Sequence, residues 1–368
     1  MRVVIAASSG VSLVNFRGNL IRDIVARGHD VTCISCEPPE EWEAAVKELG
    51  ASYVQVPMSR TGTAFFEDVK TIFAFKKTLK ELNPDVFFAY MSKPIAYGGM
   101  AAKMLKIPNM YVLVSGLEIA FYSGGLKNAV VRFVLKTLFG NTHKACKKIF
   151  FQNPDDQAVF KKLGIVTDEQ TVLVNGSGVD MTHFTRKPLP EEPVVLMVAR
   201  LVWSKGIREY LRAAQLVKEQ RPNVRFLLVG GLDTNPESLT KDELDEHIGA
   251  STIEYLGHSG DVREHLEKCS VFVLPSYHEG TPRSVLEAMA TGRPIITTDA
   301  PGCRETVKEG YNGYLVPVGD SEQMAARIIE LADDAAKRQQ MADHAYSMCD
   351  EKYDVVKVNR QMIKEMEL

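Results

Sequence analysis

Short apolar runs alternate with amphipathic segments along the first half of the chain. Runs of strand length occupy residues 3–7, 31–35, 53–56, 86–89, 110–114 and 149–151. Helical patterns separate them, the first at 16–26 and the last at 126–146. This alternation predicts a parallel, doubly wound sheet with helices on both of its faces.

The same alternation restarts after Asn175. Strand-like runs lie near Val194 and at 225–229, 253–256, 271–274 and 294–297. A second Rossmann-like domain is therefore expected. We place the junction near the cluster of Gly164, Gly176 and Gly178, which gives two α/β domains facing across a cleft, 1–170 and 171–352, followed by a helical tail at 353–368.

Two glutamates eight residues apart, Glu279 and Glu287, form the most informative motif. Pro282 fits the first position of a helix, because its missing N–H costs nothing there. The backbone amides of Arg283 and Ser284 would then point out of the helix N-terminus and favour a phosphate. Carboxylates on both sides of a phosphate site suit a sugar nucleotide. The alternative is that Ser284 caps the helix and Glu287 closes a capping box.

Two cations, Arg200 and Lys205, follow the apolar run 194–199 and precede an amphipathic segment at 207–218. In open α/β sheets ligands bind at the carboxyl ends of strands. Arginine offers a planar fork to a phosphate there, and lysine a point charge. As the alternative, either cation is a surface residue paired with the nearby Glu209.

The turn Arg200-x4-Lys205-Gly206, followed by Glu279-x7-Glu287, resembles the retaining nucleotide-sugar glycosyltransferases of family 4, which have the two-domain GT-B fold. Segments 151–153, 175–180 and 301–302 extend this resemblance along nearly the whole chain. It is closest to bacterial enzymes that extend polyprenyl-diphosphate-linked saccharides for capsule, O-antigen or protein glycosylation. The resemblance implies that the tail crosses back onto the first domain.

The resemblance also implies that the first domain binds the acceptor and the second the nucleotide-sugar donor, with uridine favoured as its base. Catalysis is assigned to Arg200, Lys205 and Glu279. Donor contacts are expected from Gly10, Gly178, Gly231, Thr281, Pro282, Arg283, Ser284 and Glu287, and acceptor contacts from Arg17, Arg60, Lys93, Lys127 and Arg132. Many relatives carry a histidine after the fifth strand, where this chain has Ser-Gly-Leu-Glu at 115–118, so the donor sugar stays open.

Basic residues concentrate in one region of the chain. Between residues 86 and 154, nine lysines and arginines stand against one acid, Glu118, although the whole chain has a net charge of −3. This asymmetry indicates an anionic partner. Within the region, the basic, apolar stretch 119–148 has the composition of a helix that lies in a membrane interface, where anionic lipid attracts it further.

A weaker version of the pattern occupies residues 65–77. Phe65, Val69, Ile72 and Phe73 would share one helical face, and Lys70 and Lys77 another. For this segment alone, an ordinary helix with a core-facing side and a solvated lysine side is favoured over a membrane helix.

Composition excludes several other classes. The net charge of −3 argues against general nucleic-acid binding. Cys33 and Cys36 lie in a predicted strand, which favours buried or strand-end thiols over zinc or redox chemistry. No Asp-x-Asp motif stands near a strand end, so no metal or other cofactor is expected. Without a secretory signal or a spanning segment of roughly 20 apolar residues, the predicted location is cytoplasmic, attached peripherally to the inner face of the cell membrane.

Together these features predict a metal-independent, retaining transferase. It would move a hexose or N-acetylhexosamine from a UDP-sugar to a membrane-anchored polyprenyl-diphosphate saccharide. Two other classes stay open: a nucleotide-sugar epimerase on the same fold, and a non-catalytic nucleotide-sugar-binding protein. Neither has a use for the basic, apolar stretch.

Overall fold

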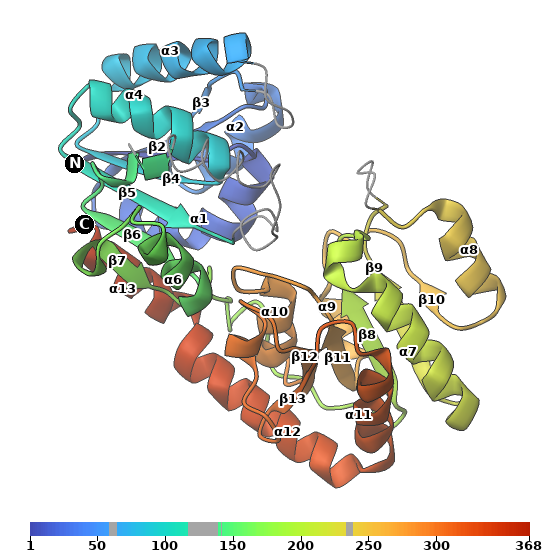
Figure 1. The fold of residues 1–368 in the computed structure, drawn as a ribbon. Helices are drawn as coiled ribbons and strands as arrows, with labels where there is room; N and C mark the ends of the chain where they lie inside the picture. The colour runs from blue at the N-terminus through green and yellow to red at the C-terminus, as the bar shows by residue number, and fades with distance from the viewer. Residues whose placement is uncertain (59–64, 117–138, 141, 233–237) are drawn as a thin grey trace. The chain divides into compact units, whose positions relative to one another are not determined.

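The fold is that of a computed structural model, which describes residues 1–58, 65–116, 139–140, 142–232 and 238–368 (Figure 1). The chain divides into two compact units. Unit 1 comprises Met1–Ser177 and Val358–Leu368, and unit 2 comprises Gly178–Lys357. The chain passes from unit 1 to unit 2 after Ser177 and back after Lys357, a few residues beyond the two boundaries expected from the sequence.

Within the described residues, unit 1 contains a seven-stranded parallel sheet in the order β3-β2-β1-β4-β5-β6-β7. The strand order reverses between β1 and β4, as in doubly wound folds. The strands are β1 Arg2–Ala6, β2 Asp30–Ser35, β3 Ser52–Gln55, β4 Val86–Tyr90, β5 Asn109–Val114, β6 Lys148–Phe151 and β7 Thr171–Leu173.

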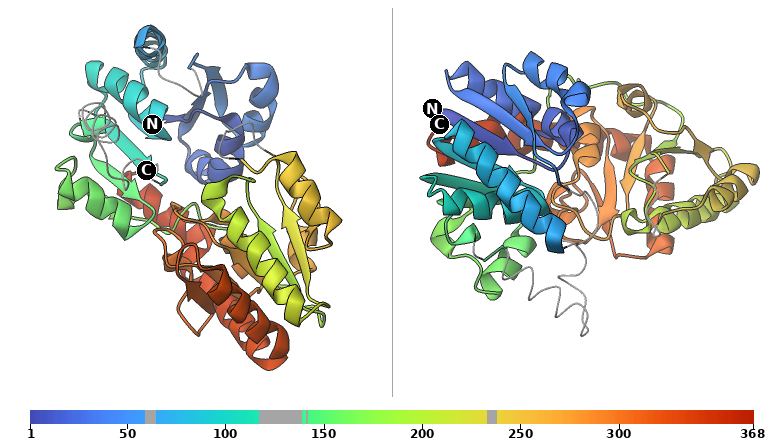
Figure 2. Two further views of the ribbon diagram at one scale, coloured as in Figure 1. Left: turned by 45° about the vertical axis from the view of Figure 1, so that its right-hand side comes forward. Right: turned by 90° about the horizontal axis from the view of Figure 1, so that it is seen from above.

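Helices cover both faces of this sheet (Figures 1 and 2). Successive strand residues alternate between two cores: Val4 and Ala6 belong to one, Val3 and Ile5 to the other. The first core receives α3 Phe65–Leu82, α4 Gly99–Met104 and α6 Pro154–Lys162; the second receives α1 Gly10–Ala26, α2 Pro39–Glu48 and α13 Val355–Glu365. Short helical turns η1 Pro94–Gly98 and η3 Asp168–Gln170 complete the unit.

The C-terminal helix α13 returns to unit 1, as the resemblance implied. The Asn359 side chain donates to the Asp23 carboxylate at 2.7 Å, and Gln361 donates to the backbone oxygen of Leu173 at 2.9 Å. Val358, Met362 and other apolar residues of α13 fill the core beneath the sheet. Both ends of the chain therefore lie in unit 1 (Figure 1).

Unit 2 repeats the doubly wound plan with a six-stranded parallel sheet in its described residues, ordered β10-β9-β8-β11-β12-β13. The strands are β8 Val194–Val198, β9 Arg225–Val229, β10 Glu254–Tyr255, β11 Val271–Leu274, β12 Ile295–Thr298 and β13 Gly313–Val316. The helices are α7 Ile207–Gln220, α8 Lys241–Gly249, α9 Arg263–Glu267, α10 Arg283–Ala290, α11 Ser321–Asp333 and α12 Ala335–Met348, with turns η4 Trp203–Lys205, η5 Arg304–Thr306 and η6 Cys349–Tyr353.

Helix α3 differs from the face assignment made from its sequence. Phe73 was expected on the apolar side with Ile72, yet its side chain is 61% exposed. Because the helix continues to Leu82, the core-facing stripe runs through Ile72, Phe75 and Leu79, at spacings of three and four residues. Phe73 is rotated away from that stripe, onto the side that carries the exposed Lys70 and Lys77.

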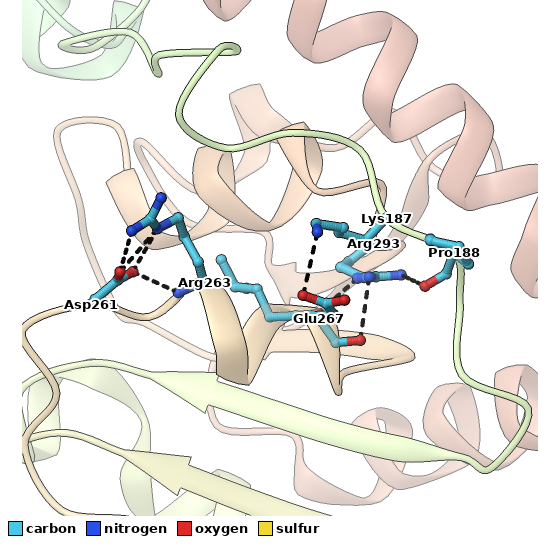
Figure 3. Close-up of polar contacts among 7 residues, drawn as sticks. Lys187, Pro188, Asp261, Arg263, Glu267 and Arg293 are labelled. Atoms are coloured by element: carbon cyan, nitrogen blue, oxygen red, sulfur yellow. Dashed lines mark hydrogen bonds and ion pairs between the residues drawn. The ribbon is translucent and has the colours of Figure 1, made fainter.

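In unit 2, a fully buried arginine links the backbone at Pro188 to the end of helix α9 (Figure 3). The Arg293 guanidinium donates to the backbone oxygens of Leu266 at 2.9 Å and Pro188 at 3.0 Å, and to that of Glu267 at 3.5 Å. Two of these carbonyls belong to the last turn of α9, where the Leu266 oxygen also accepts from the Cys269 amide at 3.2 Å. The Lys187 ammonium, 3.4 Å from the Glu267 carboxylate, lies beside this cluster. Burial lowers the pKa of Arg293, because it disfavours the charged guanidinium, and hydrogen bonds to these acceptors stabilise that charged form.

We expect Arg293→Met to lower the unfolding free energy of the protein by about 3 kcal/mol, because three hydrogen bonds from a buried guanidinium to backbone oxygens are lost. Arg263→Met is the matched control, since Arg263 is exposed and bonded only to the nearby Asp261 among the contacts drawn in Figure 3. Urea unfolding monitored by circular dichroism measures both. Equal midpoints for the two variants would contradict the structural role of Arg293.

Candidate functional site

The two sequence motifs of unit 2 follow neighbouring strands. β8 pairs directly with β11, Val195 opposite Val271 and Leu196 opposite Phe272. The strand order of the sheet reverses at this pair, and in open α/β sheets such a reversal opens a crevice at the carboxyl ends of the strands. The loop with Arg200 and Lys205 and the loop with Glu279 both start at this edge.

Backbone contacts lock these loops together. The amide of Tyr277 donates to the Ser204 oxygen at 3.0 Å, and the amide of Glu279 donates to the Pro301 oxygen at 2.9 Å. Gly206 has a φ of +75°, and a Cβ there would lie 2.1 Å from the Pro275 oxygen. Gly302, with a φ of +81°, would likewise place a Cβ 2.1 Å from the Glu279 oxygen. Only glycine permits both approaches, so the loops after β8, β11 and β12 meet closely.

The Lys205 ammonium lies 2.5 Å from Oε1 of Glu279. Both side chains are largely buried, with 19% and 15% of their surface exposed. The structure therefore joins one cation of the first motif to one carboxylate of the second. The alternative pairing of a motif cation with Glu209 is not formed by Lys205, and the Glu209 carboxylate instead accepts from the Tyr277 hydroxyl at 2.7 Å.

Helix α10 begins one residue later than expected. Pro282 is its N-cap, with an extended ψ of 112°, and Arg283 is its first residue. The capping box expected as the alternative does not form, because Ser284 is the second residue of the helix and not its N-cap. The Glu287 carboxylate instead accepts from Nε of Arg283 at 2.8 Å. Burial raises the pKa of Glu287, and the charge of Arg283 opposes that rise.

The remaining candidates for the donor site occupy several loops of unit 2. Arg200 is exposed at the end of β8, and Thr281 and Ser284 are half-buried beside the start of α10. Gly231 follows β9, and a Cβ there would lie in ordinary van der Waals contact with His258, at 3.8 Å. Close packing accounts for the glycine at position 178, because a Cβ there would lie 2.6 Å from the Val355 Cα.

In unit 1 the candidates gather where β1 and β4 end. The Gly10 amide, expected near the donor phosphates, donates to the Glu37 carboxylate at 2.8 Å, and a Cβ on Gly10 would collide with the Trp42 ring at 2.3 Å. Arg17 is buried with its guanidinium 5.4 Å from the centroid of the Tyr90 ring. Lys93 lies 3.7 Å from the Asp68 carboxylate of α3.

A cavity of about 540 Å³ lies beside the carboxyl ends of β2 and β3 and the first turns of α3. Its polar lining comes from Cys36, Gln55, Glu67, Lys70 and Thr71. Three predicted acceptor residues, Arg60, Lys127 and Arg132, and also Glu118, lie outside the described residues.

The described end of the basic stretch 119–148 is partly buried in unit 1, while its Lys144 and Lys147 are exposed. Phe139 and His143 are buried, and burial lowers the pKa of the His143 imidazole to about 4. Lys147 lies 2.9 Å from the Glu367 carboxylate, and Lys148 lies 4.0 Å from that of Glu365, both on the C-terminal segment. These residues therefore stabilise unit 1. The rest of the stretch, 119–138, is outside the described residues.

All six cysteines are free thiols. Cys33 is buried in β2, where burial raises its pKa to about 12, and Cys36 follows the strand. The prediction of strand and strand-end thiols is confirmed. Among the described residues, no group of three or more His, Cys, Asp or Glu side chains is arranged to hold a metal ion. Likewise, none of the helices in the described ranges combines the length and hydropathy needed to cross a membrane.

Comparison with known proteins agrees with this architecture. Residues 181–348 match the family described as glycosyl transferases group 1, and residues 5–153 match glycosyl transferase 4-like proteins. The chain is 31% identical over 359 residues to N,N'-diacetylbacillosaminyl-diphospho-undecaprenol α-1,3-N-acetylgalactosaminyltransferase from Campylobacter jejuni, covering 94% of this chain and 93% of that relative. It is 27% identical over 294 residues to UDP-Gal:α-D-GlcNAc-diphosphoundecaprenol α-1,3-galactosyltransferase from Escherichia coli, covering 76% and 74%.

Solved structures share the fold. Sucrose-phosphate synthase from Thermosynechococcus elongatus aligns with a TM-score of 0.81 at 18% identity, covering 99% of this chain and 98% of that one. HepE from Anabaena, in complex with UDP, aligns with a TM-score of 0.77 at 19% identity over 100% of both chains. With the two doubly wound units and the near-full-length relative, these similarities show that the chain belongs to the family 4 glycosyltransferases and has the GT-B fold.

Proposed function

We propose that this protein is a retaining glycosyltransferase that moves a hexose or N-acetylhexosamine from a UDP-sugar to a polyprenyl-diphosphate-linked saccharide. The observation that carries the proposal is the meeting of Lys205 and Glu279 at the strand-order reversal of unit 2. A cation and a carboxylate at that place suit the diphosphate and the hydroxyls of one nucleotide sugar.

The relatives support the substrate classes. The Campylobacter and Escherichia coli enzymes are named for undecaprenyl-diphosphate-linked acceptors, and the latter for a UDP-galactose donor. Both names specify an α-1,3 linkage. An α product formed from an α-linked UDP-sugar keeps the configuration at the anomeric carbon, which is the meaning of retention.

In unit 2, Arg200, Lys205 and the backbone amides of Arg283 and Ser284 would bind the donor diphosphate. Thr281 and Pro282 shape the loop that presents these amides. Glu279 would accept from hydroxyls of the donor sugar, and Glu287 from the ribose hydroxyls. Gly231 lies after β9, where close backbone approach suits the nucleoside. Gly10 and Gly178 stay predicted donor contacts, although close packing by itself also accounts for a glycine at each position.

The chemistry then depends on stabilising the leaving group. The bond from the anomeric carbon to the diphosphate breaks, the bond to the acceptor oxygen forms on the same face, and the acceptor proton passes to the departing diphosphate oxygen. Charge grows on the diphosphate during this step, so preorganised cations and amides lower the barrier most. Because Arg200 and Lys205 supply this positive charge, we propose that the reaction needs no metal ion.

Unit 1 would bind the acceptor. The cavity beside β2 and β3 offers amide, hydroxyl and carboxylate groups to a saccharide, and Lys70 lies in its wall. Lys93 and the predicted residues Arg17, Arg60, Lys127 and Arg132 would supply positive charge to the acceptor diphosphate. We further propose a cytoplasmic location with peripheral attachment to an anionic membrane through 119–138 and the outer side of α3.

Incubating the protein with labelled UDP-hexoses and UDP-N-acetylhexosamines and detergent-solubilised polyprenyl-diphosphate sugars tests the proposed reaction. We expect label to reach the lipid-linked product, with an α anomeric proton by NMR, and the rate to survive EDTA. Conversion of the UDP-sugar without acceptor would indicate an epimerase instead. Nucleotide binding without turnover in every mixture would indicate a non-catalytic binding protein.

Arg200→Ala should reduce kcat about 10²- to 10³-fold, as expected for loss of one group that stabilises transition-state charge. The matched control is Arg212→Ala, which removes an exposed arginine from α7 of the same unit. Steady-state transfer rates and thermal unfolding midpoints are measured for both. A folded Arg200→Ala protein with near-normal transfer would refute the assigned role.

The outer side of α3 should contact anionic lipid. Lys77 and Lys80 are exposed on the side that carries Phe73. We expect Phe73→Ser to weaken sedimentation with phosphatidylglycerol vesicles about tenfold, the size of a partly buried phenylalanine contribution.

Val356→Ser is the control for this measurement, because Val356 is an exposed apolar residue, 54% accessible, outside that helix. Wild-type binding should also fall as salt is raised. Unchanged sedimentation of Phe73→Ser would contradict the proposed membrane contact of α3.

A further inference from the structure

An arginine occupies an electrostatically unfavourable place in α10. Arg283 is the first residue of this helix, whose first turn contains no acidic residue. A cation at a helix N-terminus is disfavoured by the helix dipole. Its guanidinium turns along the helix to Glu287, four residues on, with Nε 2.8 Å from Oε1. This interaction compensates for the cost of its position.

Glu287 needs such a partner because of where it lies. Its side chain is 12% exposed, and its helix neighbours Val285, Leu286 and Ala288 are fully buried. Burial raises its pKa, and the charge of Asp261 raises it further. Asp261 stays ionised, since Arg263 lies 2.9 Å from both of its oxygens and holds its pKa at about 2 (Figure 3). The charge of Arg283, from the same helix, opposes both effects.

The pair has no evident capping function. The N-cap of α10 is Pro282, which cannot donate to a glutamate, and Glu287 is beyond the third helical position that a capping box requires. An ion pair of this kind adds little stability by itself, and replacing a partly buried pair by apolar residues is often neutral. The ion pair is better explained by the ligand-binding role that we propose for the Glu287 carboxylate.

We propose that Arg283 is a positioning residue, whose side chain keeps the Glu287 carboxylate ionised and fixed in one orientation to accept hydrogen bonds from the ribose hydroxyls of the donor nucleotide. The proposal rests on the ribose role that the proposed function gives to Glu287. It adds a side-chain role to Arg283, whose backbone amide alone was assigned to the diphosphate.

The test compares UDP with 2′,3′-dideoxy-UDP, which lacks both ribose hydroxyls, by isothermal titration calorimetry between pH 5.5 and 8.5. The variants are Arg283→Met, Arg283→Lys and Glu287→Gln, with Arg212→Met as the surface control. For each protein the ratio of the two dissociation constants reports the ribose contacts alone. Titration of the phosphates is common to both nucleotides and cancels in this ratio.

We expect the wild type and Arg212→Met to prefer UDP at least about tenfold at pH 7.5, as hydrogen bonds to a charged group allow. Glu287→Gln should lose most of the preference at every pH. Arg283→Met should lose it at low pH and regain part of it towards pH 8.5. The sign follows because removing the cation raises the Glu287 pKa further, so the carboxylate protonates at a higher pH than in the wild type. Arg283→Lys, which keeps the charge, should be intermediate.

Three outcomes decide the matter, with thermal midpoints measured without nucleotide to verify folding. If Arg283→Met keeps the wild-type preference at all pH values while Glu287→Gln loses it, the positioning role is wrong and the proposed function stands. If Arg283→Met weakens both nucleotides equally, its side chain acts on the diphosphate or on the fold, which also overturns the inference. If Glu287→Gln keeps the wild-type preference, or if the wild type shows no preference, the ribose role within the proposed function fails first.

Discussion

The parallel pairing of β8 with β11 is the constraint on which the site of unit 2 depends. These strands are adjacent in the sheet, although α7, β9, α8, β10 and α9 separate them along the chain. Because the strand order reverses there, the loops that follow them meet at one edge while their helices go to different sides. Gly206 and Gly302 then allow the backbones to touch, and Lys205 reaches Glu279. Without this pairing the two motifs would be unrelated surface loops.

Both glutamates of the Glu279-x7-Glu287 motif form ion pairs within unit 2. Each of the two motif carboxylates accepts from a cation nearby, Glu279 from Lys205 and Glu287 from Arg283. Partly buried charges need such partners, since an isolated one would be neutralised or expelled. A ligand that carries both negative phosphates and hydroxyls can replace or share these contacts without leaving a charge unpaired. This internal pairing is the property of the site on which the proposed nucleotide-sugar donor rests.

Local patterns predicted most of the strands but not all of them. β7 and β13 were missed because Thr171–Leu173 has only three residues and Gly313–Val316 begins with a glycine, so neither has a distinct apolar run. The Arg283–Glu287 pair was also missed, although its spacing of four residues is visible in the sequence. Phe73 was assigned to the wrong face because the helix extends further than the segment considered. The hydrogen bond from the Gly10 amide to the Glu37 carboxylate was also missed, because Glu37 comes from the end of the next strand.

By itself the sequence determined the class of the fold, the order of its elements and the residue types of the proposed donor site, because alternating apolar periodicity and motif spacing are local properties of the chain. Only the tertiary structure decided which of these residues meet. The contact of Lys205 with Glu279 joins residues 74 positions apart, and it exists because the strand order places their loops side by side. Burial of Glu287 beside the charge of Asp261 was likewise decided by packing, since the electrostatic environment of a side chain is set by neighbours that are distant in sequence.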